Sequence, residues 1–291
     1  MKNVAWDLYQ LFLVVARKGG LSAAATASGM SAPTLGRRML ELEQGLGREL
    51  FLRSQTGYEL TADGQALLEQ LKDMESAVRK LDAWQGSAKG DVLVRIAAGT
   101  WIGLLISENF STLWQPHDGF RVELTIGEQR ANLAYRENDI GIRAFAPEEP
   151  NLASRSAGEV AYAPFRARNS TATGSEVWLA VDRDNAHSAY LRWPHEQVAG
   201  KIMTTVNRPR SLRDLALSGA GIAVLPCVAG DLEPGLERAG EEIGSLRHRQ
   251  WIVMNDDDRH RPEIRTVLDR LSGLLGRYRD VLAGRRPGQI V

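Results

Sequence analysis

The chain has 291 residues, 43% of them hydrophobic and 25% charged, and its 36 basic and 36 acidic side chains give a formal net charge of zero. These values are typical of a soluble globular protein of about two domains, and the neutral balance gives no general support to a nucleic-acid binder. The single cysteine, Cys227, excludes an internal disulfide and is typical of a cytoplasmic protein. Beside Pro226, we interpret it as a buried structural residue.

The N-terminal residues predict a helix rather than a signal peptide. Apolar side chains recur at helical spacing at Leu8, Leu11, Phe12 and Val15. Asp7 and Gln10 interrupt the apolar run, and Arg17 and Lys18 stand where a signal peptide has small residues before its cleavage site. No run reaches the roughly 18 apolar residues of a membrane span, so we expect a cytoplasmic protein without membrane contact.

Residues 21–46 predict two short helices joined by a tight turn. Ser22 and Ser31 are candidate N-caps for the two helices, and Gly29 between them suits a turn position with positive φ. Pro33 lies in the first turn of the second helix, where its missing N–H costs nothing. The buried face of this second helix is expected to carry Leu35, Met39, Leu42 and Leu46.

The opposite face of the second helix is polar. At helical spacing it carries Pro33, Thr34, Arg37 and Glu41, with Gly36 and Arg38 on its flanks. Such a face fits the major groove of DNA, where arginine can read guanine N7 and O6. The alternative is an ordinary helical hairpin with a solvated charged face.

Residues 47–60 favour the DNA-binding interpretation. The apolar Leu50 to Leu52, then Arg53 with a polar tip, then the alternating Tyr58 to Leu60 predict a two-stranded wing. A helix-turn-helix followed by a wing is a winged helix.

With this motif complete, the sequence resembles the LysR-type transcriptional regulators. The residues that carry the resemblance are Leu8 to Phe12, Ser22, Ala24, Ala25, Ser31, Pro33, Leu35, Arg37, Leu42, Glu43, Leu46, Gly47, Leu50, Phe51, Arg53, Leu60, Thr61 and Gly64. The resemblance implies DNA contacts from Ser31, Ala32, Pro33, Thr34, Gly36, Arg37 and the wing residue Arg53. The chain departs from the family at Ala32, where Gln is usual, and at Gly36, where Ser is usual. Arg38 could compensate for the lost contacts.

A long helix is predicted from Ala62 to about Trp84, with Thr61 as its cap. Its apolar residues Leu67, Leu71, Met74, Val78 and Leu81 form a short heptad seam. The alternative is an amphipathic helix packed on its own domain. The resemblance implies a linker helix that pairs two subunits. Because residues 1–61 carry only seven basic against five acidic side chains, a homodimer would supply the charge and symmetry that one chain lacks.

Beyond a flexible hinge at 86–90, strands alternate with helices, which predicts an α/β architecture with mostly parallel sheets. Strands are expected around Val92–Ile96, Val122–Ile126, Ile140–Arg143, Val177–Val181, Met203–Val206, Gly221–Leu225 and Trp251–Met254, with helices from Thr100, Ser211 and Pro262. The resemblance implies two subdomains hinged like a periplasmic binding protein. The whole fold is therefore expected to be α+β and multidomain: winged helix-turn-helix 1–61, linker helix 62–85, regulatory domain 91–282 (subdomain I about 91–160 and 252–282, subdomain II about 161–251) and a disordered tail 283–291.

A small-molecule effector is expected between these subdomains, outside the carboxyl ends of the strands. The candidate residues are Thr100, Trp101, Gly127, Glu128, Arg143, Thr205, Asn207 and Ser211. Free N–H groups near Thr100 and Ser211, together with Arg143, would favour an anion. The alternatives are that Thr100 and Ser211 are simply N-caps, Trp101 a core residue and Arg143 a surface cation.

The sequence shows no motif of an enzyme or a metal site. It lacks a phosphate-binding loop, a nucleophile elbow and a zinc-protease motif, and Asp256 to Asp258 with His260 are interpreted as a solvated turn. We therefore expect no catalytic residue, metal or cofactor. The expected function is a LysR-type regulator that binds double-stranded DNA and a small-molecule co-inducer, as a homodimer or a dimer of dimers, with RNA polymerase as a further possible partner. Two alternatives stay open: an α/β region that serves only assembly, and a cytoplasmic small-molecule-binding protein or enzyme with a vestigial winged domain.

Overall fold

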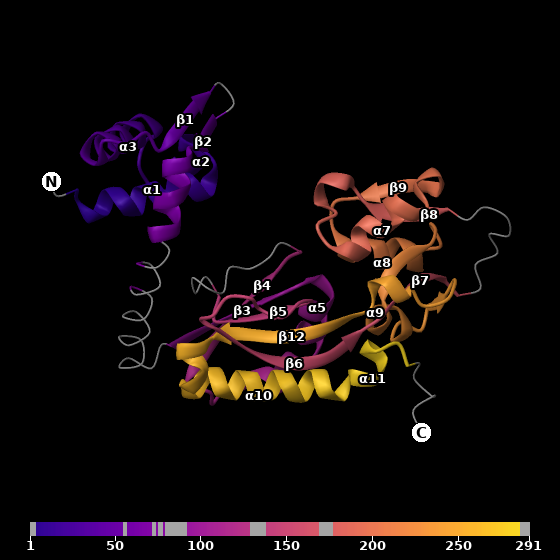
Figure 1. Ribbon diagram of the computed structural model, residues 1–291. Helices are drawn as coiled ribbons and strands as arrows, with labels where there is room; N and C mark the ends of the chain where they lie inside the picture. The colour runs from indigo at the N-terminus through magenta and orange to yellow at the C-terminus, as the bar shows by residue number, and fades with distance from the viewer. Residues whose placement is uncertain are drawn as a thin grey trace. The chain divides into compact units, whose positions relative to one another are not determined.

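The computed structural model describes residues 4–54, 57–71, 74, 78, 92–128, 138–168 and 177–285 (Figure 1). The chain forms two compact units, Met1–Asp82 and Ala83–Val291. Leu81, the expected hinge 86–90 and residues 286–291 of the expected tail lie outside the described residues. None of the helices in the described ranges is long and apolar enough to cross a membrane.

The first unit is a winged helix-turn-helix, as predicted. Its helices are α1 (Trp6–Lys18), α2 (Leu21–Ser28) and α3 (Ala32–Leu46), and its wing is the antiparallel pair β1 (Phe51–Ser54) and β2 (Gly57–Leu60). Residues 62–71 continue as a helix. The apolar stripes read from the sequence meet in one core, in which the fully buried side chains include Phe12, Val15, Leu35, Met39 and Leu42.

The predicted turn between α2 and α3 is confirmed, with one correction. Gly29 has a φ of 70°, and the Ser31 hydroxyl accepts the Thr34 N–H at 3.3 Å as the cap of α3. Ser22, in contrast, is not a cap, because α2 already begins at Leu21 and Gly20 takes the N-cap position. Ser22 therefore lies inside the first turn.

The second unit begins with a five-stranded sheet in the order β4-β3-β5-β12-β6. Its strands are β3 (Val92–Ala98), β4 (Phe120–Ile126), β5 (Ile140–Arg143), β6 (Leu152–Val160) and β12 (His248–Asn255). Three helices accompany it: α5 (Thr100–Glu108), α6 (Phe110–Leu113) and α10 (Pro262–Arg277), of which α10 lies along the sheet (Figure 1). The chain leaves this sheet after Val160 and returns at His248, so the last long strand and helix pack with the first ones.

Residues 162–238 build the remaining sheets. A three-stranded antiparallel sheet has the order β10-β7-β11, and β8 pairs with β9 in parallel. The strands are β7 (Tyr162–Ala167), β8 (Trp178–Val181), β9 (Ile202–Val206), β10 (Ala223–Pro226) and β11 (Leu236–Arg238). The helices are α7 (Ala189–Gln197), α8 (Pro209–Leu217) and α9 (Cys227–Asp231), with the 3-10 turns Arg183–Asn185, Ala199–Lys201 and Gly244–Leu246.

The prediction of mostly parallel sheets is wrong. Only β3 with β4 and β5, and β8 with β9, run parallel among the described strands, whereas β12 runs antiparallel to both of its neighbours. The error arises because the antiparallel strands β6, β7 and β11 were not predicted. The sequence of β6 is polar, and Pro164 in β7 argues against a central strand.

The C-terminal residues of the second unit are ordered further than expected. The short helix α11 (Arg279–Leu282) follows α10, and the Ala283 N–H bonds the Arg279 carbonyl at 3.0 Å. Arg285 pairs with Asp280. Residues 283–285, expected in the disordered tail, therefore belong to the folded unit.

Candidate nucleic-acid interface and effector site

The residues expected to contact DNA lie together at the start of α3 and along its outer face. Ser31, Pro33, Thr34 and Arg37 are exposed, and Ala32, Gly36 and Arg38 are half-buried. On the opposite face, Leu35, Met39 and Leu42 are fully buried, whereas Leu46 at the end of the helix is partly buried. The 3.6-residue period thus leaves one face of α3 open to a large ligand.

The two arginines on this face differ in their partners. Arg38 donates through Nη1 to Glu41 Oε2 at 3.1 Å, an exposed pair of the kind that adds little stability. Arg37 makes no hydrogen bond or ion pair with any described residue. An unpaired, exposed guanidinium in the middle of this face is free to bind a phosphate or a base edge.

Gly36, where the family usually has Ser, is a point of close packing. A Cβ built on Gly36 would lie 3.3 Å from Leu21 Cδ1 and 4.0 Å from the Tyr58 hydroxyl. The glycine therefore lets α3 approach both α2 and the wing closely.

A buried glutamate fastens the wing to α3. Glu43 is 8% exposed, and its Oε1 accepts the N–H groups of Leu50 at 2.8 Å and Phe51 at 3.2 Å. Sequence reasoning noted Glu43 only as part of the family resemblance and missed this role. Arg53 is the third residue of β1, opposite Tyr58; its side chain lies outside the described part of the structure.

The apolar residues of the helix after the wing lie in two different environments. Thr61 caps it by accepting the Gly64 N–H at 2.9 Å, as predicted. Leu67 and Leu71 pack into the winged-domain core, whereas Met74 is 49% and Val78 38% exposed. The start of the seam thus packs on its own domain, and the next two residues present apolar surface.

Three of the expected effector residues come together at the start of α5. Glu128, which follows β4, accepts the Thr100 N–H on Oε1 at 3.0 Å, and its Oε2 accepts the Ser188 hydroxyl. Trp101 donates its indole N–H to the Tyr190 hydroxyl at 3.0 Å. Sequence reasoning missed Ser188 and Tyr190, which begin α7.

This arrangement corrects the expectation of free N–H groups for an anion. The N–H of Thr100 is already bonded to a carboxylate of the chain itself. Thr100 is the first helical residue and not the cap, which is Gly99; Ser211 is the third residue of α8, because Pro209 starts that helix. Burial, with the charge of Glu128, raises the pKa of Tyr190, so its hydroxyl stays protonated beside this carboxylate.

The other candidate effector residues are not joined to this group. Gly127, Thr205 and Asn207 are exposed, and no hydrogen bond between described residues links Thr205, Asn207 or Ser211 to Glu128. Arg143 is 7% exposed and lies 3.9 Å from Glu149 Oε1, so the alternative of a surface cation is wrong. Trp101, at 5% exposure, is a core residue.

Two further reactive side chains, Cys227 and Asp258, are buried. Burial raises the pKa of the Cys227 thiol to about 12, so it is not a thiolate nucleophile at neutral pH. Asp258 is buried rather than solvated and lies 3.8 Å from Arg261 Nη1. Within the described ranges, no group of three or more His, Cys, Asp or Glu side chains could hold a metal ion.

Residues 6–65 match the family model described as "Bacterial regulatory helix-turn-helix protein, lysR family". The N-terminal winged domain is therefore similar to the DNA-binding domain of the LysR family. Among curated relatives, the regulator TcbR of Pseudomonas sp. (strain P51) is 43% identical over 82 residues, which is 28% of each chain. The activator CmpR of Synechocystis sp. is 26% identical over 52% of this chain and 50% of its own. The matches thus span between about a quarter and a half of these LysR relatives.

The likeness to a solved structure extends over nearly the whole chain. The crystal structure of the LysR regulator CbnR has a TM-score of 0.57 and 22% identity, and the match covers 93% of this chain and 99% of CbnR. The described architecture, a winged domain followed by α/β sheets, is therefore similar to the fold of CbnR.

Proposed function

We propose that this protein is a transcriptional regulator that binds specific sites in double-stranded DNA through α3 and the wing. The observation that carries the proposal is the exposed face of α3, with Arg37 unpaired among the described residues and Ser31 capping the helix end. A solved complex of CbnR with its target DNA shows that a protein of this fold binds DNA.

We expect the protein to form a homodimer because one winged domain carries little net charge and the linker helix exposes apolar side chains. Residues 1–61 carry a net charge of only +2, so one winged domain makes few phosphate contacts. Met74 and Val78 expose apolar side chains four residues apart, in register with the seam that begins at Leu67. A homodimer formed there, and a dimer of dimers built from it, would place several recognition helices on one duplex.

The second unit serves as a sensor for a small molecule in this proposal. The cleft expected near Thr100 is organised by Glu128, which bonds both the start of α5 and the start of α7. A ligand acts there only if it binds two arrangements of these elements with different affinity. Binding of the ligand would change how the subunits associate and hence how the winged domains bind the DNA. The proposal also includes contact with RNA polymerase and a cytoplasmic location.

The test is to select fragments of the source genome with the purified full-length protein and to footprint the selected fragments at two salt concentrations. The proposal predicts a few protected sites with an imperfect inverted repeat, and an affinity that falls as salt rises. Diffuse recovery without a shared site would instead favour a small-molecule-binding protein or enzyme with a vestigial winged domain.

The sensor role has its own test. Thermal denaturation of the full-length protein against a metabolite library is expected to yield at least one saturable stabilisation. A flat profile, with a positive control for the method, would favour an α/β region that serves only assembly.

A further inference from the structure

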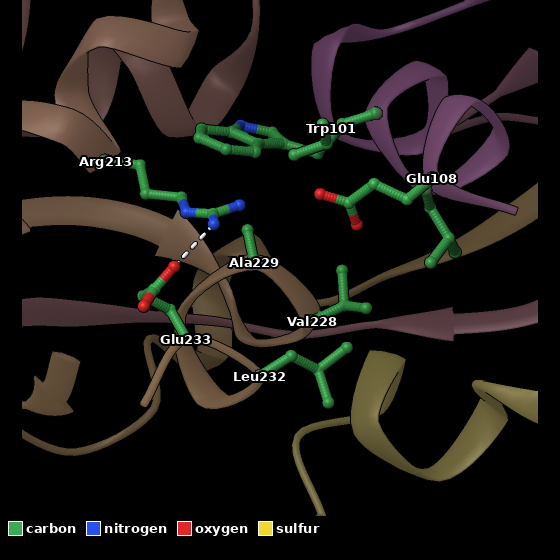
Figure 2. Close-up of a pocket in the computed structure, with 9 residues that line it drawn as sticks. Trp101, Glu108, Arg213, Val228, Ala229, Leu232 and Glu233 are labelled. Carbon is green, nitrogen blue, oxygen red and sulfur yellow. Dashed lines mark hydrogen bonds and ion pairs between the residues drawn. The ribbon is translucent and has the colours of Figure 1, made fainter. Parts of the chain in front are cut away.

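A pocket lies along α5, on the face that carries Trp101, Leu104 and Glu108 (Figure 2). Its other wall comes from Arg213 of α8 and from α9 and the residues after it. The pocket has a volume of about 110 Å³. Apart from Trp101, its lining contains none of the residues expected at the effector cleft.

The pocket has an apolar floor between two opposite charges. Figure 2 shows the Arg213 guanidinium and the Glu108 carboxylate pointing toward one another across the pocket, with the Trp101 ring on one side and Val228 and Ala229 on the other. No ion pair joins these two groups among the described contacts. Glu108 is exposed at its end of α5.

Arg213 is only partly satisfied by the protein. Its Nη2 lies 2.5 Å from Glu233 Oε2, and both side chains are more than four-fifths buried. Its Nε is buried and has no hydrogen-bond partner among the described residues. The guanidinium therefore keeps hydrogen-bonding capacity beyond its pair with Glu233.

We propose that this pocket binds a small zwitterion of the amino-acid type. Its carboxylate accepts from the side of the Arg213 guanidinium that faces the pocket, and its ammonium group pairs with Glu108 at the mouth. A simple anion would face the two carboxylates Glu108 and Glu233 with only one guanidinium in return, and a simple cation could pair with Glu108 but would offer no acceptor to Arg213. The volume of about 110 Å³ suits a small ligand.

The pocket shares Trp101 with the expected effector site. Trp101 contacts the pocket with its ring and bonds Tyr190 of α7 with its indole N–H. A ligand that fixes Trp101 would therefore stabilise the contact between α5 and α7. The binding itself does not depend on the regulatory function proposed above.

Calorimetric titration of the full-length protein tests the proposal with glycine, β-alanine and γ-aminobutyrate, which differ in the distance between their charges. We expect saturable binding of at least one of them, and at least tenfold weaker binding of propionate and of propylamine. Absence of saturable binding for all three, or propionate binding as tightly as the best zwitterion, overturns the proposal.

Glu108→Gln is the decisive variant, because Glu108 is exposed and its replacement leaves the fold intact. It is expected to weaken binding of the best zwitterion at least tenfold. The matched control Glu196→Gln, which replaces an exposed glutamate on α7, is expected to bind the zwitterion as tightly as wild type does. The double variant Arg213→Gln with Glu233→Gln removes the cation without leaving a buried charge unpaired, and it is expected to abolish binding. Equal binding by wild type and Glu108→Gln would overturn the proposal.

Discussion

Replacement of Glu43 by alanine tests how the wing is held against the recognition helix. The change leaves the N–H groups of Leu50 and Phe51 without their acceptor, and these two residues are only 1% and 5% exposed. Each unsatisfied buried N–H costs about 1 to 3 kcal/mol. The alanine variant no longer has to bury a carboxylate, which offsets part of this cost. We therefore expect the free energy of unfolding of the winged domain to fall by about 2 to 3 kcal/mol.

Hydrogen exchange of the full-length protein measures this loss directly. A loss of 2 to 3 kcal/mol raises the exchange rate of amides that are protected by global opening of residues 4–54 by about 30- to 160-fold. Glu43→Gln keeps a carbonyl acceptor at the same place and should cost about 1 kcal/mol or less. The reasoning would be refuted if Glu43→Ala exchanged at the wild-type rate, or if the glutamine variant were as unstable as the alanine variant.

Three further perturbations have defined outcomes. The hydrogen bonds of Arg270 hold the pKa of Asp118 below its usual range, so this pair stabilises the fold above the ordinary aspartate pKa and the contribution is lost as pH falls through the lowered value. Asp118→Asn should therefore lower the free energy of unfolding, measured with urea, by about 1.5 to 3 kcal/mol at pH 7 and by much less near pH 2. An equal loss of free energy at the two pH values would contradict the assignment. Gly230→Ala places a Cβ 2.4 Å from Phe165 in the core and should cost about 1 to 3 kcal/mol in thermal unfolding, so an unchanged Tm would show that the ring has room to move. Met74→Glu should shift full-length protein toward monomer in analytical ultracentrifugation, and an unchanged dimer would place the interface elsewhere.

The sequence predicts those features that are encoded by residues close together along the chain. Ser31 caps α3 and Gly29 turns the chain because both act within three or four residues, and the period of Leu35, Met39 and Leu42 identifies the buried face without further information. The whole winged helix could therefore be predicted.

The sheets and the effector site depend on contacts that the local pattern does not contain. Pro164 lies in β7, the middle strand of an antiparallel sheet. Pairing with the strands on either side, and not the strand preference of proline, determines the structure there. Glu128 could be listed as a candidate because it follows a strand, yet its partner Ser188 lies 60 residues further along the chain. Arg143 reads as a surface cation until the fold buries it beside Glu149.

The central claim is that α3 binds specific DNA through Arg37. The most direct measurement compares Arg37→Ala with the control Lys18→Ala, which removes one exposed positive charge from the end of α1, on a footprinted site and on unrelated DNA of equal length. If Arg37 reads a base, its loss costs about 1 to 3 kcal/mol on the specific site, about 5- to 160-fold in Kd, and lowers the specificity ratio, whereas Lys18→Ala leaves that ratio unchanged. If Arg37→Ala bound the specific site as tightly as wild type, α3 would not be the recognition helix and the account would be wrong.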